Sequence, residues 1–168
     1  MSRTLSAYVH VPFCATRCGY CDFNTYTASE LSRDNTSVSP STYADRVIKQ
    51  IEWHAQYQPD DRKIYSIFFG GGTPTMLPAK ELGRIVASLQ SIYGIEAGAE
   101  VTTEANPDSV DEKYINELRE GGFTRVSFGH QSSSPRVLEF LERTHTAGRT
   151  WDAVKWARVA GFEHVSVD

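Results

Sequence analysis

The chain has 168 residues, of which 40% are hydrophobic and 23% are charged, and its formal net charge is -4. This composition excludes disordered and collagen-like chains, and the length suits one domain with a sizeable core. Because acidic residues outnumber basic ones and no basic run occurs, it also argues against a nucleic-acid partner bound through its phosphates.

Strand and helix patterns alternate along the chain. Alternating apolar residues predict a first strand at residues 7–11, followed by a loop rich in Thr, Ser and Asn as far as Ser39. Further strands are predicted at residues 64–69, 100–104, 125–128 and 164–168. Helices are expected between them: from Ser39-Pro40, from Pro78, from a capping box at Ser109–Glu112 to Gly121, and over residues 134–141 and 150–160.

This order indicates βα units and a parallel sheet with right-handed crossovers. The expected fold is α/β, an incomplete parallel (β/α) barrel with five strands present. The chain stops on a strand with no helix after it, so we expect residues 1–168 to form one domain truncated before the last barrel strand and a C-terminal domain. An apolar interior and one sheet edge would then be uncovered, and the chain alone would be poorly soluble or would associate.

A polar residue, a cysteine cluster or a glycine run stands at the end of every predicted strand. The cysteines follow the first strand and the glycines the second, Glu104 ends the third, Gln131 lies just past the fourth, and Asp168 ends the fifth. In parallel barrels the chemistry gathers at the carboxyl ends of the strands. The sequence therefore predicts one site to which all five strands contribute.

All three cysteines fall within Cys14-x-x-x-Cys18-x-x-Cys21. An odd number confined to one segment is not a disulfide framework, and it favours a reducing compartment. With no signal peptide and no apolar stretch of membrane-spanning length, we expect a cytoplasmic protein without a membrane span. Thiolates at this density favour zinc or an iron–sulfur cluster. Structural zinc needs a fourth ligand, for which only His10 is near, so the spacing favours a cubane cluster with one open iron, and metal-free thiols are a weaker alternative.

The run Gly70-Gly71-Gly72-Thr73-Pro74 lacks the Lys-Ser/Thr ending of a phosphate-binding loop. Three glycines after a buried strand favour a ligand lying against bare backbone, where a Cβ would push into it. A plain turn is the alternative for this run taken alone.

Together these motifs resemble the radical S-adenosylmethionine (SAM) proteins. Within them the chain is similar to the oxygen-independent coproporphyrinogen III oxidase-like group, in particular its heme-chaperone branch. The resemblance runs from Ala7 to Asp168 and implies a barrel of the radical SAM type. The matching segments are Tyr8-x-His-Val-Pro-Phe-Cys14-x-x-x-Cys18-Gly-Tyr-Cys21, Gly-Gly-Gly-Thr-Pro-Thr, Glu104-Ala-Asn-Pro and Arg125-Val-Ser-Phe-Gly-His-Gln131-Ser.

The resemblance implies a [4Fe-4S] cluster on Cys14, Cys18 and Cys21, with SAM on the fourth iron. The resemblance also implies the SAM contacts: Tyr8 lines the site and Tyr20 lies near the adenine. Gly71, Gly72 and Thr73 lie along the methionine, whose ammonium and carboxylate contact Glu104 and Arg143. Gln131 and Asp168 contact the ribose hydroxyls. A zwitterion calls for one anion and one cation, and an Arg fork suits a carboxylate. Without the resemblance, Glu104, Asp168 and Arg143 would be interpreted as solvated charges.

Two features depart from parts of the family. The coproporphyrinogen dehydrogenases have a further cysteine soon after the triad, whereas Asp22-Phe23-Asn24-Thr25 follows here, as in the chaperone branch. His130 stands where relatives have an apolar residue, and it is either a local substitution or an extra ligand. We assign no role to the other histidines, which are His10, His54, His145 and His164.

The resemblance leaves two functions open, and no catalytic residue is assigned for either. The favoured one is a heme chaperone that binds heme or a porphyrin and passes heme to an unknown acceptor, with the cluster and SAM serving regulation or assembly. The alternative is a radical SAM oxidoreductase, supplied by an electron-donor protein, that removes hydrogen from a porphyrin propionate chain and so decarboxylates coproporphyrinogen III. Decarboxylated porphyrin together with 5′-deoxyadenosine would discriminate between them.

Overall fold

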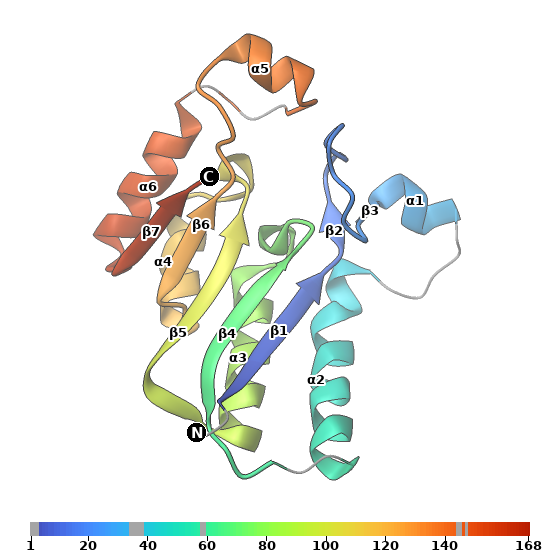
Figure 1. Cartoon of the computed structure of the whole chain (residues 1–168), viewed down its shortest axis with the longest axis vertical. Coiled ribbons are helices and arrows are strands. Elements are labelled where there is room, and N and C mark those ends of the chain that lie inside the picture. Colours follow the sequence, from blue (N-terminus) through green and yellow to red (C-terminus); the bar gives the residue numbers. More distant parts are fainter. Residues whose placement is uncertain (1–3, 34–38, 58–59, 144–145, 147) are drawn as a thin grey trace.

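The computed structural model describes residues 4–33, 39–57, 60–143, 146 and 148–168 (Figure 1). A parallel five-stranded sheet has the order β1-β4-β5-β6-β7. Its strands are Leu5–Val11, Ile64–Gly71, Ile95–Ala105, Arg125–Phe128 and His164–Val167. The sheet is open, with β1 and β7 at its edges, so the predicted α/β class and incomplete parallel barrel are confirmed.

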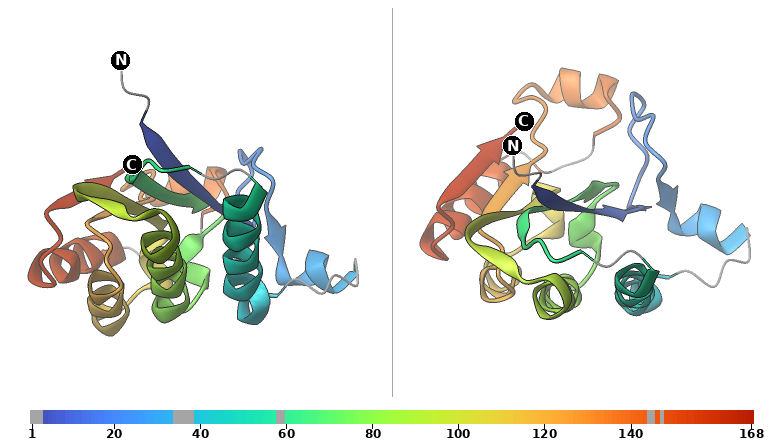
Figure 2. Two further views of the ribbon diagram at one scale, coloured as in Figure 1. Left: turned by 90° about the horizontal axis from the view of Figure 1, so that it is seen from below. Right: turned by 60° about the horizontal axis from the view of Figure 1, so that its bottom comes forward.

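One face of this sheet is covered by helices (Figure 2). They are α2 (Pro40–Tyr57), α3 (Ala79–Tyr93), α4 (Glu112–Glu120) and α6 (Arg149–Val159). The shorter α5 (Pro135–Phe140) lies beyond the carboxyl ends of the strands. Each of these helices lies within two residues of its predicted position. In the described ranges, no helix combines the length and apolarity needed to cross a membrane.

The segment expected to be a plain loop up to Ser39 contains regular structure, and residues 34–38 of it lie outside the described part. Strands β2 (Phe13–Cys14) and β3 (Tyr26–Thr27) form a small parallel sheet, and the helix α1 (Ala28–Arg33) follows. The Glu30 carboxylate accepts hydrogen bonds from the Thr27 N–H at 2.7 Å and the Thr27 hydroxyl at 2.9 Å. This Thr-x-x-Glu capping arrangement explains why a helix starts there.

The predicted capping box at Ser109–Glu112 is wrong in its cap residue. Asp111 is the N-cap of α4, and its carboxylate accepts a hydrogen bond from the Tyr114 N–H at 2.7 Å. The Ser109 hydroxyl donates instead to the Asn106 carbonyl at 2.8 Å, within the short turn η2 (Pro107–Ser109). The helix ends at Gly121, as predicted.

The hydrophobic core lies between the sheet and the covering helices. Alternate strand residues point into it, among them Val9, Ile67 and Val126, and each is at most 6% exposed. The rings of Phe69 and Phe123 meet at its centre, with their centroids 5.1 Å apart. This layer contains the larger buried side chains, so most of the apolar stabilisation arises on this side of the sheet.

The expected apolar interior is wrong, because the face of the sheet that no helix covers carries polar side chains. Strand alternation that directs valines and isoleucines toward the helices places hydroxyls and charges on the opposite face. Arg125 pairs there with Glu100 at 3.4 Å and donates to the Ser166 hydroxyl at 3.3 Å. Tyr8 and Phe68 add a stacked aromatic pair. This pair is exposed apolar surface on the face, and the expected poor solubility or association of the chain stays a prediction.

We expect Phe123→Ala to lower the free energy of unfolding by about 3–5 kcal/mol, because it empties a fully buried position against Phe69. The control is Phe140→Ala, because Phe140 is 86% exposed and its truncation should change stability little. Urea unfolding followed by circular dichroism measures both. Equal losses in the two variants would contradict the placement of the core.

Candidate functional site

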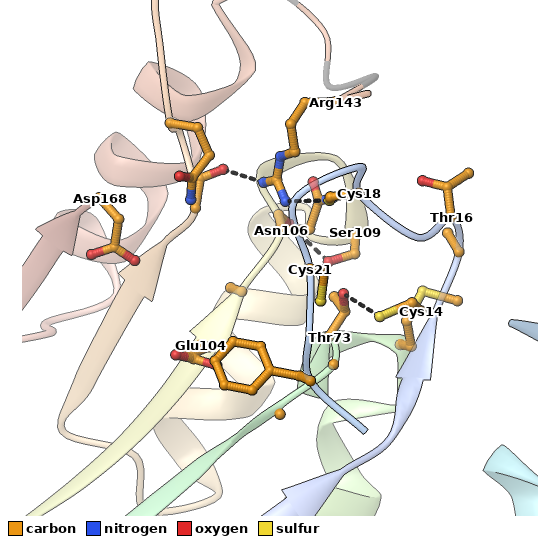
Figure 3. A pocket seen from close by; sticks show the side chains of 18 of the residues that line it. Cys14, Thr16, Cys18, Cys21, Thr73, Glu104, Asn106, Ser109, Arg143 and Asp168 are labelled. Atoms are coloured by element: carbon orange, nitrogen blue, oxygen red, sulfur yellow. Dashed lines mark hydrogen bonds between the residues drawn. The ribbon is translucent and has the colours of Figure 1, made fainter. Parts of the chain in front are cut away.

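The carboxyl ends of the strands open into a pocket of about 710 Å³ (Figure 3). It brings together every predicted site residue except Tyr8. The predicted residues that line it are Cys14, Cys18, Tyr20, Cys21, Gly71, Gly72, Thr73, Glu104, Gln131, Arg143 and Asp168. These side chains come from separate βα segments, so the pocket exists only when the parallel sheet has formed.

Tyr8 is exposed on the open face of the sheet and does not line the pocket. Its hydroxyl lies 3.0 Å from His10 Nδ1, and its pKa is raised by partial desolvation of the hydroxyl and then by the nearby Glu104 carboxylate. His10 Nε2 bonds to the carbonyl of Asn24 at 2.8 Å. His10, which was given no role, thus links β1 to the segment that follows the cysteines.

The three cysteines are half-buried and carry free thiols. The Thr73 hydroxyl donates to Cys14 Sγ at 3.9 Å, and Arg143 Nη1 donates to Cys18 Sγ at 3.4 Å (Figure 3). Within the described ranges, no three His, Cys, Asp or Glu side chains converge as ligands of one ion. A cubane takes one thiolate on each of three irons, so its thiolates need not meet at a single point.

The cysteine segment is held from two sides. Arg17, between the first two cysteines, pairs with Glu30 of α1 at 3.2 Å and also donates to the Thr25 carbonyl. On the other side, the Gly19 N–H donates to the Leu141 carbonyl at 3.4 Å, just beyond α5. These contacts hold the cysteine segment between α1 and the end of α5.

The glycine run lies directly beneath the cysteine segment. The Gly72 N–H donates to the Val11 carbonyl and the Thr73 N–H to the Phe13 carbonyl, each at 2.7 Å. A Cβ on Gly72 would lie 2.6 Å from the Phe13 oxygen and 3.0 Å from Cys14 Sγ. A Cβ on Gly71, whose φ is +110°, would lie 2.6 Å from the His10 ring. The missing side chains thus make room for the protein's own groups, and the expectation that a Cβ there would also push into a ligand stays a prediction.

Two carboxylates stand at the ends of β5 and β7. Burial raises the pKa of Glu104, the Gly71 N–H opposes this shift by bonding to the carboxylate, and the charge of Asp168 adds to it. Asp168 in turn accepts hydrogen bonds from the Ser127 hydroxyl at 3.1 and 3.2 Å. The backbone of Gln131, at φ +63°, donates to the Asp168 carbonyl at 2.7 Å. Negative charge is therefore concentrated on this side of the pocket.

Positive charge enters the pocket from Arg143. Its guanidinium donates to the Gly129 carbonyl at 2.5 Å and to Cys18, so it is held at the pocket wall and is not a solvated helix charge. The preceding residue, Glu142, has φ +54°, and the chain turns there after α5. Tyr20 lies nearby, and its pKa is raised by burial, an effect that the Arg143 charge opposes.

Several pocket residues were missed, although some lie inside motifs that were recognised. Asn106 belongs to the Glu104-Ala-Asn-Pro segment and Ser127 to the segment that starts at Arg125. Both lie near the carboxyl end of a predicted strand, so their place in the pocket could have been predicted from the sequence. Glu142 gave no local signal, because only the turn after α5 brings it to the pocket. The other missed lining residues include Asp108 and Ser109.

His130 lies outside this pocket. It lines a neighbouring pocket of about 510 Å³ together with Trp151, and Glu142 and Arg143 line both pockets. Its Nδ1 lies 3.0 Å from the Thr150 hydroxyl and its Nε2 lies 2.9 Å from the Ser133 hydroxyl. The residue is thus tied to its own surroundings, which favours a local substitution over an extra ligand near the cysteines. His145 lies outside the described residues.

Comparison with known proteins gives consistent matches. The family model for the radical SAM superfamily matches residues 8–168. A heme chaperone HemW of Mycobacterium tuberculosis is 41% identical over 166 residues, which are 99% of this chain and 41% of that protein. An oxygen-independent coproporphyrinogen III oxidase of Synechocystis is 33% identical over 164 residues, 98% of this chain and 34% of that protein.

A solved structure matches as well. The coproporphyrinogen III oxidase HemN of Escherichia coli, described as a radical SAM enzyme, superposes with a TM-score of 0.84 at 28% identity. The match covers 99% of this chain and 37% of that one. The chain spans about two fifths of the length of the curated heme chaperone that it matches.

We expect Gly72→Ala to lower the iron retained after anaerobic reconstitution, because the added methyl group would collide with the Phe13 carbonyl and press on Cys14. The matched control is Gly98→Ala, which strains the backbone at φ +81° but places its methyl group in open space. Iron and protein assays give the ratio for each. An iron content as high in Gly72→Ala as in Gly98→Ala would refute the close approach of the glycine run to Cys14.

Proposed function

Because the chain belongs to the radical SAM superfamily, we propose that residues 1–168 are the radical SAM core of a cytoplasmic heme chaperone. The core holds a [4Fe-4S] cluster and SAM, and the protein binds heme and transfers it to an acceptor. The single observation that carries this proposal is that the cysteine triad, the glycine run and an opposed Glu–Arg pair line one pocket.

In this proposal, Cys14, Cys18 and Cys21 each hold one iron of the cluster. When bound, the cluster and SAM together supply one-electron chemistry, for which an electron-donor protein provides the electron. The segment that carries the three thiols is fixed by Arg17 and by the Gly19–Leu141 backbone bond. In this proposal, these contacts reduce the conformational entropy that the loop loses when the cluster binds.

SAM is a zwitterion at its methionine end, and the pocket offers both charges that it needs. Glu104 is the proposed partner of the ammonium group and Arg143 that of the carboxylate, for which the planar guanidinium is suited. Arg143 is already oriented by Gly129. Gln131 and Asp168 take the ribose hydroxyls, and Asp168 is oriented by Ser127. Tyr20 lies toward the adenine, and Gly71, Gly72 and Thr73 lie along the methionine. For Tyr8 we propose an indirect role, because it contacts His10.

Of the two relatives compared by sequence identity, the heme chaperone is more similar to this chain than the oxidase is, and this favours the chaperone function. The matching heme chaperone is 41% identical and the matching oxidase 33%. In addition, Asp22-Phe23-Asn24-Thr25 follows the triad without a further cysteine. The alternative, oxidative decarboxylation of coproporphyrinogen III, is supported by the close superposition on HemN.

Anaerobic reconstitution with iron and sulfide tests the proposal. About four irons per chain are expected, with a spectrum that changes when SAM is added, and replacing any of the three cysteines by Ala should abolish iron uptake. Stoichiometric zinc without iron uptake would contradict the cluster. Because no heme-binding residue is assigned within residues 1–168, hemin binding is measured on the whole protein, where a Soret shift is expected and its absence would contradict the chaperone function. If it forms decarboxylated porphyrin and 5′-deoxyadenosine from coproporphyrinogen III, the pure chaperone function is rejected.

We expect Arg143→Ala to weaken SAM binding by about 1.5–3 kcal/mol, because it removes charge-assisted hydrogen bonds to the SAM carboxylate. Arg136→Ala is the control, since Arg136 is exposed on α5 and does not line the pocket. Calorimetric titration of reconstituted protein, normalised to iron content, measures both variants. If Arg143→Ala binds SAM as tightly as Arg136→Ala does, Arg143 is not part of the SAM site.

A further inference from the structure

Thr25 has a buried hydroxyl that lacks a partner. The residue is 2% exposed, and across the described ranges its Oγ1 is the buried side-chain nitrogen or oxygen for which no hydrogen-bond partner is found. Native proteins pair nearly all such groups, because an unpaired hydroxyl in a dry environment is destabilising. An orphan donor next to a ligand site therefore points to a partner that forms on ligand binding.

The backbone around Thr25 is fixed, so its hydroxyl is held in place. Its carbonyl accepts a hydrogen bond from Arg17, and the next residue, Tyr26, donates its N–H to the Pro12 carbonyl at 2.7 Å. Two residues on, Thr27 is the strand partner of Cys14. This pairing of β2 with β3 keeps Thr25 beside the first cysteine of the triad.

The surroundings of Cys14 are consistent with a hydroxyl donor there. The Thr73 hydroxyl donates to the Cys14 sulfur at 3.9 Å, whereas the Thr25 hydroxyl lies near this sulfur without completing a hydrogen bond. A thiol is a weak acceptor, whereas a thiolate carries the charge that makes such a bond strong.

We propose that Thr25 is a positioning residue whose Oγ1–H donates a hydrogen bond to the Cys14 sulfur when that sulfur is a cluster thiolate. The inference rests on the proposed function, because it requires a cluster on Cys14. Hydrogen bonds to cluster sulfurs are among the determinants of reduction potential. Because the donor stabilises the additional negative charge of the reduced cluster, Thr25 raises the potential and makes the cluster easier to reduce.

The test is a redox titration of the reconstituted chain, monitored by the electron paramagnetic resonance signal of the reduced cluster. Thr25→Val removes the hydroxyl and nearly preserves the shape, and it should disfavour reduction about tenfold, which is about 59 mV for one electron. Thr25→Ser keeps the donor and should retain the parent potential. Thr150→Val is the matched control, because Thr150 is equally buried but its hydroxyl contacts His130.

A second measurement separates this role from a structural one. In cluster-free protein, Thr25→Val should not lower the melting temperature, because the hydroxyl it removes has no partner to lose. Thr25→Ala, measured alongside, should shift the potential in the same direction as Thr25→Val.

The outcomes distinguish the two levels of proposal. If Thr25→Val has full iron content and an unchanged reduction potential, the proposed role of Thr25 is overturned and the proposed function of the chain is not affected. The role is also overturned if Thr25→Ser shifts as far as Thr25→Val, or if Thr150→Val shifts equally. Failure of the parent chain to take up iron overturns the proposed function, and this inference with it.

Discussion

The site depends on the hydrogen bonds that join the glycine run to the segment leading into the cysteines. The Gly72 and Thr73 N–H groups donate to carbonyls at the end of β1 and in β2, and these bonds continue the register in which Val11 pairs with Gly71. Cys14 can approach this closely only because Gly72 has no side chain. The positions of the thiols are therefore set by strand pairing, and the loop that carries them inherits its geometry from the sheet.

Arg143 connects the two halves of the proposed cofactor site. The same guanidinium contacts the sulfur of Cys18 and the carbonyl of Gly129 beyond β6, although Cys18 is 125 residues away in sequence. A charge that faces a thiol and, in the proposed site, a SAM carboxylate would interact with both, so a substitution of Arg143 should affect cluster binding and SAM binding together. The turn at Glu142, with its positive φ, is the local feature that brings Arg143 to this place.

Much of the fold and most of the site could be predicted because strand-end residues of parallel strands meet at one edge. Glu104, Gln131 and Asp168 needed only the correct strand boundaries. The position of Tyr8 could not be predicted, since it depends on which face of β1 is covered by helices. The close approach of Gly71 to His10 and of Gly72 to Cys14 could not be predicted either, because the direction in which a Cβ points follows from the strand register. The helix α1 carried a readable Thr-x-x-Glu signal that was overlooked.

One face of the sheet carries the apolar core that stabilises the fold, and the other carries polar residues, including those of the proposed site. In β5, Thr103 and Ala105 are buried toward the helices, while Glu104 between them faces the pocket. Burying Glu104 raises its pKa, which is unfavourable for the folded state when the carboxylate is charged. The folded state tolerates this cost because burial of the apolar core on the opposite face of the sheet stabilises the fold independently of Glu104. The same argument accounts for the Arg125–Glu100 pair and the serine hydroxyls on the open face, because their polarity leaves the packing beneath them undisturbed.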